Sequence, residues 1–237
     1  MNHLLIDLGN TRLKLAWAQG DGVDYLGTVD DPRAVVERVP EAPASIWLSS
    51  VADPQHTQQL VDALAAHWAC PIEVVSVARY HRHLPTRYAT DQLGVDRWLA
   101  MLGCRGLCQR ACLVVDCGTA ITLDLVAGEG VHVGGYILPG LGLMRQALLQ
   151  ATAIRVPEAG PSESELPTDT ASAINQGAQA SVVALIEKLL EQAGAEVALF
   201  IGGGVARSLS PLVSGRHDIV EQMVLLGLSR MEFLEKN

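Results

Sequence analysis

The octapeptide Leu4-Leu5-Ile6-Asp7-Leu8-Gly9-Asn10-Thr11 returns 109 positions later as Leu113-Val114-Val115-Asp116-Cys117-Gly118-Thr119-Ala120. Each copy is an apolar run that ends in an acid and is followed by a turn of small residues. An alternating stretch follows each turn, at 12–18 and at 121–126, as expected of a half-buried strand. Few side chains are identical, so the comparison rests on the shared order of strand, acid, glycine turn and strand. We interpret the two segments as the openings of two duplicated halves.

The flanking segments predict further strands and helices in each half. In the first half, Asp31-Pro32 and Asp53-Pro54 each place a capping acid before a proline, which predicts two helix starts. Apolar runs predict further strands at 23–28, 45–50, 72–77, 131–137 and 196–201, and apolar spacing predicts helices from about 141 and at 178–193. Residues 155–169, rich in Pro, Ser and Glu, predict a loop or an interface segment. We therefore expect an α/β protein with two lobes, residues 1–109 and 110–237, facing each other across a cleft.

Composition narrows the classes of protein. The chain has 237 residues and a formal net charge of −9, with 49 % hydrophobic and 18 % charged residues, which is enough apolar material for a sizeable core. Without a Lys/Arg run it offers no basic face, so we expect no nucleic-acid partner. No segment approaches the ~20 uncharged residues that span a bilayer, so we expect no membrane partner. Five cysteines suit a reducing compartment, and we expect a cytoplasmic protein.

The two glycine turns are candidate anion sites. Small turn residues let backbone N–H groups point at an anion, and Thr11 and Thr119 add hydroxyl donors, which suits the phosphates of a nucleotide. A carboxylate next to phosphate groups is tolerated mainly when it binds a cation, so Asp7 and Asp116 are candidate cation ligands. Alternatively, both turns are ordinary hairpins in which the aspartate accepts hydrogen bonds from the turn. The occurrence of the pattern twice favours the ligand site.

Two further segments are candidates. In Gly94-Val95-Asp96-Arg97, the carboxylate of Asp96 would stand at the positive end of a helix that begins with Leu99, Met101 and Leu102 as its apolar stripe. The alternative is a helix cap with a surface ion pair. Gly202-Gly203-Gly204 follows an apolar strand and would let an adenine ring or ribose approach the backbone, or is a plain turn. No P-loop motif occurs in the chain.

Together these segments resemble the type III pantothenate kinases, which belong to the acetate and sugar kinase, Hsp70 and actin superfamily. The resemblance covers nearly the whole chain in the family's order. The fold that the resemblance implies for this chain is α/β, with two duplicated RNase H-like (actin-like) lobes, each a mixed five-stranded sheet flanked by helices. The matching motifs are Asp7-x-Gly9-Asn10-Thr11-x-x-Lys14, Gly94-x-Asp96-Arg97, Asp116-x-Gly118-Thr119-Ala120-x-Thr122, Gly134-Gly135-x-Ile137-x-Pro139-Gly140 and Gly202-Gly203-Gly204.

The resemblance implies phosphorylation of pantothenate to 4′-phosphopantothenate with ATP as donor, the first step of coenzyme A synthesis. It implies Asp96 as the catalytic acceptor of the hydroxyl proton, Mg²⁺ with the ATP phosphates at Asp7, and K⁺ or NH₄⁺ at Asp116. It also implies a homodimer, in which Thr170 reaches the substrate of the partner subunit. The other implied ATP-binding residues are Gly9, Asn10, Thr11, Lys14, Gly118, Thr119, Gly202 and Gly203. The other implied pantothenate-binding residues are Tyr88, Gly94, Val95 and Arg97.

Two other functions stay open at this point. One is a small-molecule kinase of the same superfamily that acts on a sugar or a carboxylate. The other is an accessory or regulatory factor that binds nucleotide without turning it over, since proteins similar to this family have been described in that role. The presence of Asp7, Asp96, Arg97 and Asp116 favours catalysis.

Overall fold

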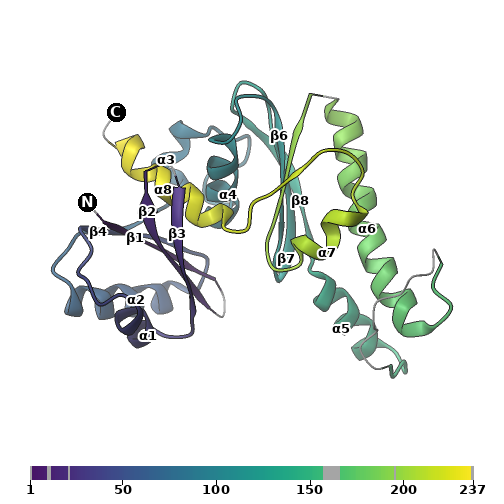
Figure 1. Cartoon of the computed structure of the whole chain (residues 1–237), viewed down its shortest axis with the longest axis horizontal. Helices are drawn as coiled ribbons and strands as arrows, with labels where there is room; N and C mark the ends of the chain where they lie inside the picture. Colours follow the sequence, from purple (N-terminus) through teal and green to yellow (C-terminus); the bar gives the residue numbers. More distant parts are fainter. Residues whose placement is uncertain (1, 10–11, 21, 157–165, 195, 236–237) are drawn as a thin grey trace. The chain divides into compact units, whose positions relative to one another are not determined.

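The computed structural model describes residues 2–9, 12–20, 22–156, 166–194 and 196–235. The chain divides into two compact units (Figure 1). The first comprises Met1–Arg110, Val126–Gly134 and Gln222–Asn237, and the second comprises Ala111–Leu125 and Gly135–Glu221. This division differs from the expected 1–109 and 110–237 because two segments of the second half belong to the first unit. The larger one carries helix α8 (Met223–Glu235), which packs against strands β1 to β4 of the first unit.

The first unit is built on a five-stranded sheet in the order β3-β2-β1-β4-β5. Its strands are β1 (His3–Leu8), β2 (Leu13–Gln19), β3 (Gly22–Val29), β4 (Ser45–Ser50) and β5 (Ile72–Val74). β1, β2 and β3 pair antiparallel, whereas β4 pairs parallel with both β1 and β5. β1 to β4 confirm the strands expected here, and the mixed sheet is confirmed. The strand expected at 72–77 is shorter, because β5 ends at Val74 and Val77 begins helix α3 (Val77–Tyr80).

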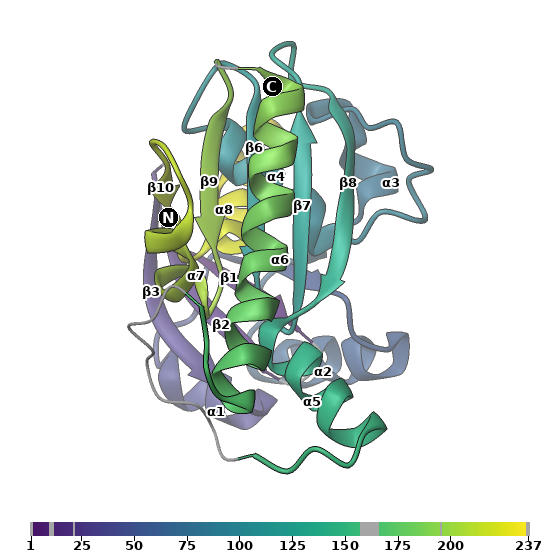
Figure 2. The same ribbon diagram turned by 90° about the vertical axis from the view of Figure 1, so that its right-hand side faces the viewer.

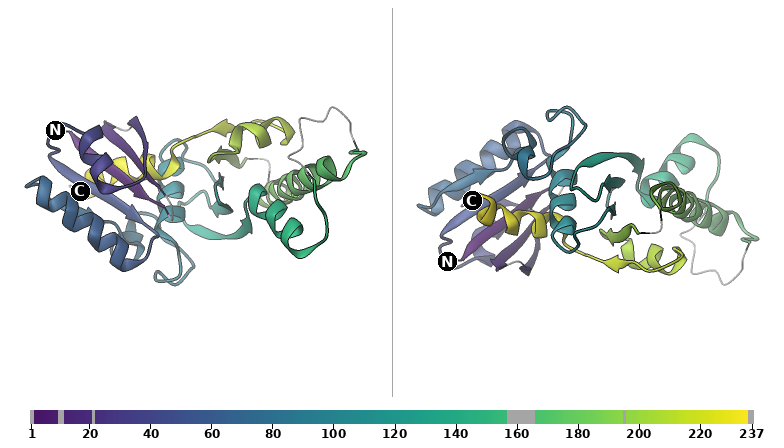
Figure 3. Two further views of the ribbon diagram at one scale, coloured as in Figure 1. Left: turned by 90° about the horizontal axis from the view of Figure 1, so that it is seen from below. Right: turned by 90° about the horizontal axis from the view of Figure 1, so that it is seen from above.

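Helices cover both faces of this sheet (Figure 3). Helices α1 (Pro32–Arg38) and α2 (Pro54–His67) begin at the two predicted aspartate caps and pack with the strands in one apolar core. From β1, this core takes Leu4, Ile6 and Leu8. Because side chains alternate along a strand, Asp7 lies on the opposite face, where α8 packs against β1 to β4 and α4 (Val95–Arg105) against β4.

The α4 helix is held from several sides. Its Trp98 is fully buried, and the indole Nε1 donates to the Leu84 carbonyl at 3.0 Å. Leu84 directly follows the short helices α3 (Val77–Tyr80) and η1 (His81–His83). α8 packs along α4 at very short range. The ideal Cβ of an alanine at Gly227 would lie 2.1 Å from the Leu99 carbonyl oxygen. The two helices therefore depend on glycine for their approach.

The second unit repeats this plan with the sheet order β10-β9-β6-β7-β8. Its strands are β6 (Cys112–Cys117), β7 (Ala120–Val126), β8 (His132–Pro139, whose first three residues belong to the first unit), β9 (Ala198–Gly202) and β10 (Asp218–Ile219). Read from β8, the order places β6 and β9 where β1 and β4 lie in the first unit. The duplication predicted from the two octapeptides is thus visible in strand order. β10, which has two residues, is too short to leave a sequence pattern.

The helices of the second unit are α5 (Leu141–Ala151), α6 (Thr170–Ala193) and α7 (Ala206–Leu209), followed by the 3₁₀ turn η2 (Ser210–Leu212). Figure 2 shows α6 lying along the sheet, and its Val182, Ile186 and Leu189 pack with β6, β7 and β9 in one core. α6 begins eight residues earlier than the predicted 178, because Asp169 caps it by accepting from the Ser172 N–H at 2.9 Å. Residues 157–165 of the predicted 155–169 segment lie outside the described residues.

Among the described residues, we find no helix that combines the length and the apolar character needed to cross a membrane.

Candidate active site

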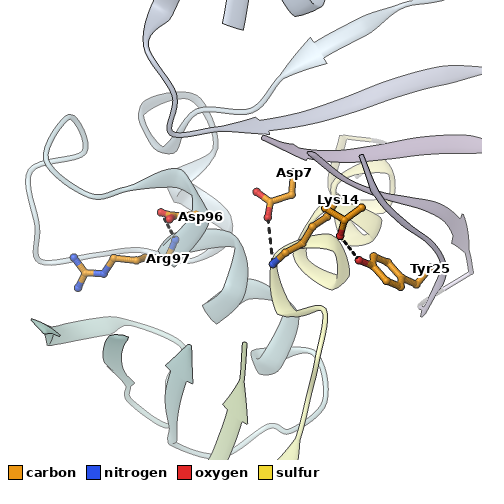
Figure 4. Close-up of polar contacts among 6 residues, drawn as sticks. Asp7, Lys14, Tyr25, Asp96 and Arg97 are labelled. Atoms are coloured by element: carbon orange, nitrogen blue, oxygen red, sulfur yellow. Dashed lines mark hydrogen bonds and ion pairs between the residues drawn. The ribbon is translucent and has the colours of Figure 1, made fainter. Parts of the chain in front are cut away.

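Asp7 and Lys14 form the polar end of the β1–β2 ribbon. The two residues are register partners across the antiparallel pair, and the Lys14 Nζ lies 4.0 Å from the Asp7 Oδ2 (Figure 4). The Asp7 side chain is only 9 % exposed, whereas that of Lys14 is 41 % exposed. A buried carboxylate beside a partly exposed ammonium group is suited to a ligand that carries both phosphate and a divalent cation. The Gly9 N–H donates to the Arg12 carbonyl at 3.1 Å.

Asp96 stands in the first turn of α4. Its Oδ1 accepts a 2.7 Å hydrogen bond from the Arg97 N–H, and the positive end of the helix favours the ionised carboxylate. Gly94 precedes the helix, and an ideal Cβ there would lie 2.5 Å from the Asp96 Oδ1. The carboxylate therefore occupies the space that a larger residue at 94 would fill. The side chain of Val95 is buried, so its backbone is what a ligand could meet.

Asp7 and Asp96 lie on the same side of the first sheet. Alternation along β1 turns Asp7 away from the core of α1 and α2, toward the face that carries α4 and α8. Figure 4 shows the carboxylates of Asp7 and Asp96 in the same region, with the Arg97 side chain extending away from Asp7. Two of the predicted groups, one for phosphate binding and one for proton transfer, are thus brought together within a single unit.

A column of side chains supports Arg97 and Tyr88. The Arg97 guanidinium lies 5.3 Å from the centre of the Tyr88 ring, and the other ring contact of Tyr88 is with His132, stacked at 5.2 Å. His132 is fully buried, and its Nδ1 lies 2.8 Å from the Thr86 Oγ1, which also accepts from the Tyr88 N–H. Sequence reasoning missed Thr86 and His132. His132 is 44 positions from Tyr88, and no local pattern signals the pairing.

In the second unit, Asp116 is the next-to-last residue of β6, as Asp7 is of β1. The β6–β7 turn is only two residues long, Gly118 and Thr119, and both are exposed. The Gly140 N–H donates to the Thr119 carbonyl at 2.9 Å, and a Cβ at Gly140 would lie 2.5 Å from that oxygen. The glycine after Pro139 therefore fixes the turn that is expected to contact the nucleotide.

The triple glycine lies against this acid. Gly202 pairs with Asp116 across β6 and β9, and Gly203, at φ +84°, has no room for a Cβ because the Asp116 Oδ1 would be 2.5 Å away. Burial, and next the charge of Asp116, raise the pKa of the Cys117 thiol to about 12, so this thiol stays neutral beside Asp116. Gly203 thus has a packing role whether or not a nucleotide contacts it.

Thr170 belongs to the second unit. It is exposed at the start of α6 and lines a groove of about 850 Å³ with α5, and none of the other predicted site residues lines this groove. Asn10 and Thr11 lie outside the described residues.

Comparison with known proteins places the chain in a family. The model of the type III pantothenate kinases matches residues 3–192. The chain belongs to the type III pantothenate kinase family. Curated relatives of that name include proteins from Chromobacterium violaceum, 36 % identical over 96 % of this chain and 98 % of the relative, and from Dichelobacter nodosus, 38 % identical over 87 % and 88 %.

Solved structures show the same fold at low identity. A conserved Baf family protein from Campylobacter jejuni superposes with a TM-score of 0.65 at 18 % identity, covering 98 % of this chain and 99 % of that one. The activator of 2-hydroxyisocaproyl-CoA dehydratase from Clostridium difficile, solved with bound ADPNP, gives 0.56 at 11 % identity, covering 100 % and 98 %. The actin-like fold expected for the family is thereby confirmed.

Proposed function

We propose that this chain transfers the γ-phosphoryl group of ATP to the hydroxyl of pantothenate, forming 4′-phosphopantothenate. Membership of the type III pantothenate kinase family supports the substrates. The observation that carries the mechanism is the Asp96 carboxylate, fixed in the first turn of α4 on the sheet face that also presents Asp7 and Lys14.

Asp96 acts as an acceptor of the hydroxyl proton rather than as a strong base. The pKa of an alcohol is near that of water, ~15.7, and the pKa of a carboxyl group is near ~4. Complete transfer of the hydroxyl proton to the carboxylate before the reaction would therefore cost on the order of 16 kcal/mol. Asp96 therefore cannot make a free alkoxide. In a loose transition state the nucleophile needs little charge until late. Asp96 orients the hydroxyl and takes its proton as the new P–O bond forms.

Asp7, Lys14 and the Gly9 turn would hold the phosphates. A Mg²⁺ ion can be bound by one carboxylate together with the phosphates of ATP. The buried Asp7 carboxylate, with Lys14 no closer than 4.0 Å, has the oxygen donors for that role. Bound there, Mg²⁺ would neutralise phosphate charge. Lys14 adds a positive charge on a partly exposed side chain.

Arg97 and Tyr88 would hold the acceptor substrate. Arg97 is 6 % exposed and supported by the Tyr88 ring, so its donors are presented in one orientation to an anionic group such as the pantothenate carboxylate. The Tyr88 hydroxyl and the backbone at Gly94 and Val95 complete the proposed contacts. This orientation would fix the hydroxyl end of the substrate at Asp96.

The proposed test of the catalytic role is the substitution Asp96→Asn. The amide has nearly the same shape but cannot accept the proton, so we expect turnover to fall to less than about 1 % of wild type, with the Kd for ATP unchanged. Product formation from ATP and pantothenate would be measured with K⁺ present, beside nucleotide binding by calorimetry. A variant that keeps more than a few per cent of the wild-type rate would show that Asp96 is not the proton acceptor.

We also propose that Asp116 holds a monovalent cation, K⁺ or NH₄⁺, near the Gly118–Thr119 turn and the Gly202–Gly203 segment, which would contact the nucleotide. The support is the half-buried carboxylate of the next-to-last residue of β6, beside that exposed turn. We expect the rate to depend on K⁺ or NH₄⁺ and this dependence to weaken in Asp116→Ala. Rates measured in buffers that hold only Na⁺ or only K⁺ would check it, and equal rates for wild type would contradict it.

The acceptor is tested with a panel of small molecules. With ATP and K⁺, pantothenate should be consumed while sugars and simple carboxylates are not. Consumption of another acceptor would favour a different kinase of the superfamily. Nucleotide binding without turnover of any acceptor would favour the regulatory alternative.

Finally, we propose a cytoplasmic homodimer. All five cysteines lie among the described residues and none is in a disulfide, which suits a reducing compartment. No side chain of α5 is buried within the chain, although the helix carries exposed Leu143 and Leu148. Of these two, Leu148 lines the groove beside Thr170. A second copy on this face would bury these residues and bring Thr170 to the substrate of its partner.

A further inference from the structure

The sheet of the first unit contains a buried hydroxyl with no role so far. Ser49 lies in β4, its side chain is fully buried, and its Oγ has no hydrogen-bond partner. The next residue differs, because the Ser50 Oγ lies 2.7 Å from the Thr57 Oγ1. A buried hydroxyl without a partner is unfavourable, since it has lost its hydrogen bonds to water without replacement. An alanine at 49 would avoid that penalty.

Ser49 is the lateral neighbour of Asp7. β1 and β4 run parallel, and their register pairs Asp7 with Ser49. Adjacent strands lie about 5 Å apart, and paired residues point to the same face. Leu48 packs in the core with α1 and α2, so Ser49 points to the opposite face, as Asp7 does. The hydroxyl and the carboxylate therefore share one face of the sheet on neighbouring strands.

The two groups complement each other chemically. An ionised carboxylate accepts hydrogen bonds at both oxygens, and a serine hydroxyl has one proton to donate. Trp47 provides a comparison on the same strand and face, because its Nε1 is also buried without a partner. The register partner of Trp47 is Leu5, whose side chain has no acceptor. Of these two unpartnered donors, Ser49 is the one beside a ligand-binding acid.

We propose that Ser49 is a positioning residue for the nucleotide site and acts through Asp7. When the phosphates of ATP and their Mg²⁺ ion bind, the Ser49 hydroxyl donates to one oxygen of the Asp7 carboxylate and leaves the other oxygen for the ligand. A change of the single χ1 angle of serine redirects the donor. This inference rests on the proposed nucleotide site and adds to it a residue that touches neither substrate.

The decisive variant is Ser49→Ala. We expect its thermal midpoint without ligand to be equal to or higher than that of wild type, because an unpaired buried hydroxyl is removed. With Mg²⁺ present, the Kd for ATP should rise about tenfold. With EDTA in place of Mg²⁺, we expect the Kd values of Ser49→Ala and wild type for ATP to differ by less than about twofold, since Asp7 then holds no cation. Calorimetry and thermal unfolding of the full chain provide these values without any assay of turnover.

Three further variants separate this role from packing. Trp47→Phe removes the neighbouring unpartnered donor, and Ser50→Ala removes a hydroxyl that has its partner in Thr57. Both should bind ATP with Mg²⁺ as wild type does. Ser49→Cys keeps a weak donor of similar size, and its Kd should fall between those of wild type and Ser49→Ala.

The inference is overturned if Ser49→Ala binds ATP and Mg²⁺ with wild-type affinity. It is overturned as well if the variant loses stability without ligand, because the hydroxyl would then have a structural partner. Pantothenate phosphorylation by wild type is measured in parallel. An active wild type with an unaffected Ser49→Ala removes this inference alone, whereas a wild type that binds ATP but does not phosphorylate pantothenate removes the proposed function and leaves the role of Ser49 standing.

Discussion

Asp96 and Gly94 depend on each other at the start of α4. Gly94 has φ −55° and ψ 134°, a conformation open to any residue, so its backbone does not require glycine. The requirement comes from space, because the Asp96 Oδ1 stands 2.5 Å from the position of a Cβ at 94. The glycine of this motif thus sets the position of the carboxylate two residues later.

Gly94→Ala should therefore affect catalysis more than folding. The added methyl displaces the Asp96 carboxylate, which can rotate away at little cost to stability. We expect kcat to fall about tenfold or more and the free energy of unfolding to change by less than about 1 kcal/mol. Steady-state kinetics and urea unfolding would measure the two effects. A variant with wild-type kcat would show that the carboxylate tolerates a second position, and a large loss of stability would assign Gly94 to the packing of α4.

At the scale of elements, the α4–α8 pair joins two segments of the first unit that are far apart in the sequence. α8 comes from the C-terminal end of the chain and packs against the helix that carries Asp96. Gly103 and Gly227 allow this approach, since a Cβ at Gly103 would lie 2.6 Å from the Met223 carbonyl oxygen and one at Gly227 2.1 Å from that of Leu99. Backbone atoms surround both positions and cannot rotate away as a side chain can.

Gly227→Ala should accordingly destabilise the fold. Forcing a methyl group against the α4 backbone separates the helices, at a cost of about 3 kcal/mol in the free energy of unfolding. Urea unfolding would measure it. Gly142→Ala is the matched control, because a Cβ at Gly142 in α5 meets nothing within 4 Å, and alanine there should be neutral or stabilising by up to about 1 kcal/mol. Equal stability of the two variants would contradict the close packing of α4 on α8.

At the scale of the whole molecule, the proposed homodimer makes each site depend on two chains. We expect Asp96→Asn and Thr170→Glu each to be inactive alone. Glutamate in the first turn of α6 suits the helix dipole and preserves folding. When the two variants are refolded together in equal amounts, half of the dimers should be hybrids. In each hybrid one of the two sites has both Asp96 and Thr170, so activity should recover to about a quarter of wild type.

The same mixture also tests the opposite possibility, that each site is formed by one chain. If Thr170 served the site of its own chain, every hybrid site would carry one defect and the mixture would stay inactive. Light scattering on wild type provides the control, since a monomer would rule out sharing altogether.

Much of the first unit follows from local sequence. Asp31-Pro32 and Asp53-Pro54 predict helix starts because a cap and a proline act within one turn. β1 follows from its short apolar run, and β2 follows from the alternation that is typical of a half-buried strand. The candidate residues Asp7 and Asp96 could be proposed for the same reason, as each stands at the end of a locally recognisable element.

Other features depend on contacts between distant residues. No local pattern brings His132 under Tyr88, pairs Ser49 with Asp7 or returns α8 to the first sheet. Periodicity and caps report on hydrogen bonds and burial within a few residues, and they determined most strands and the longer helices of both halves, with the exception of α8, and the duplicated plan. Register, the choice of sheet face and the neighbours of a buried hydroxyl are set by packing across the whole unit, and only the tertiary structure decided them.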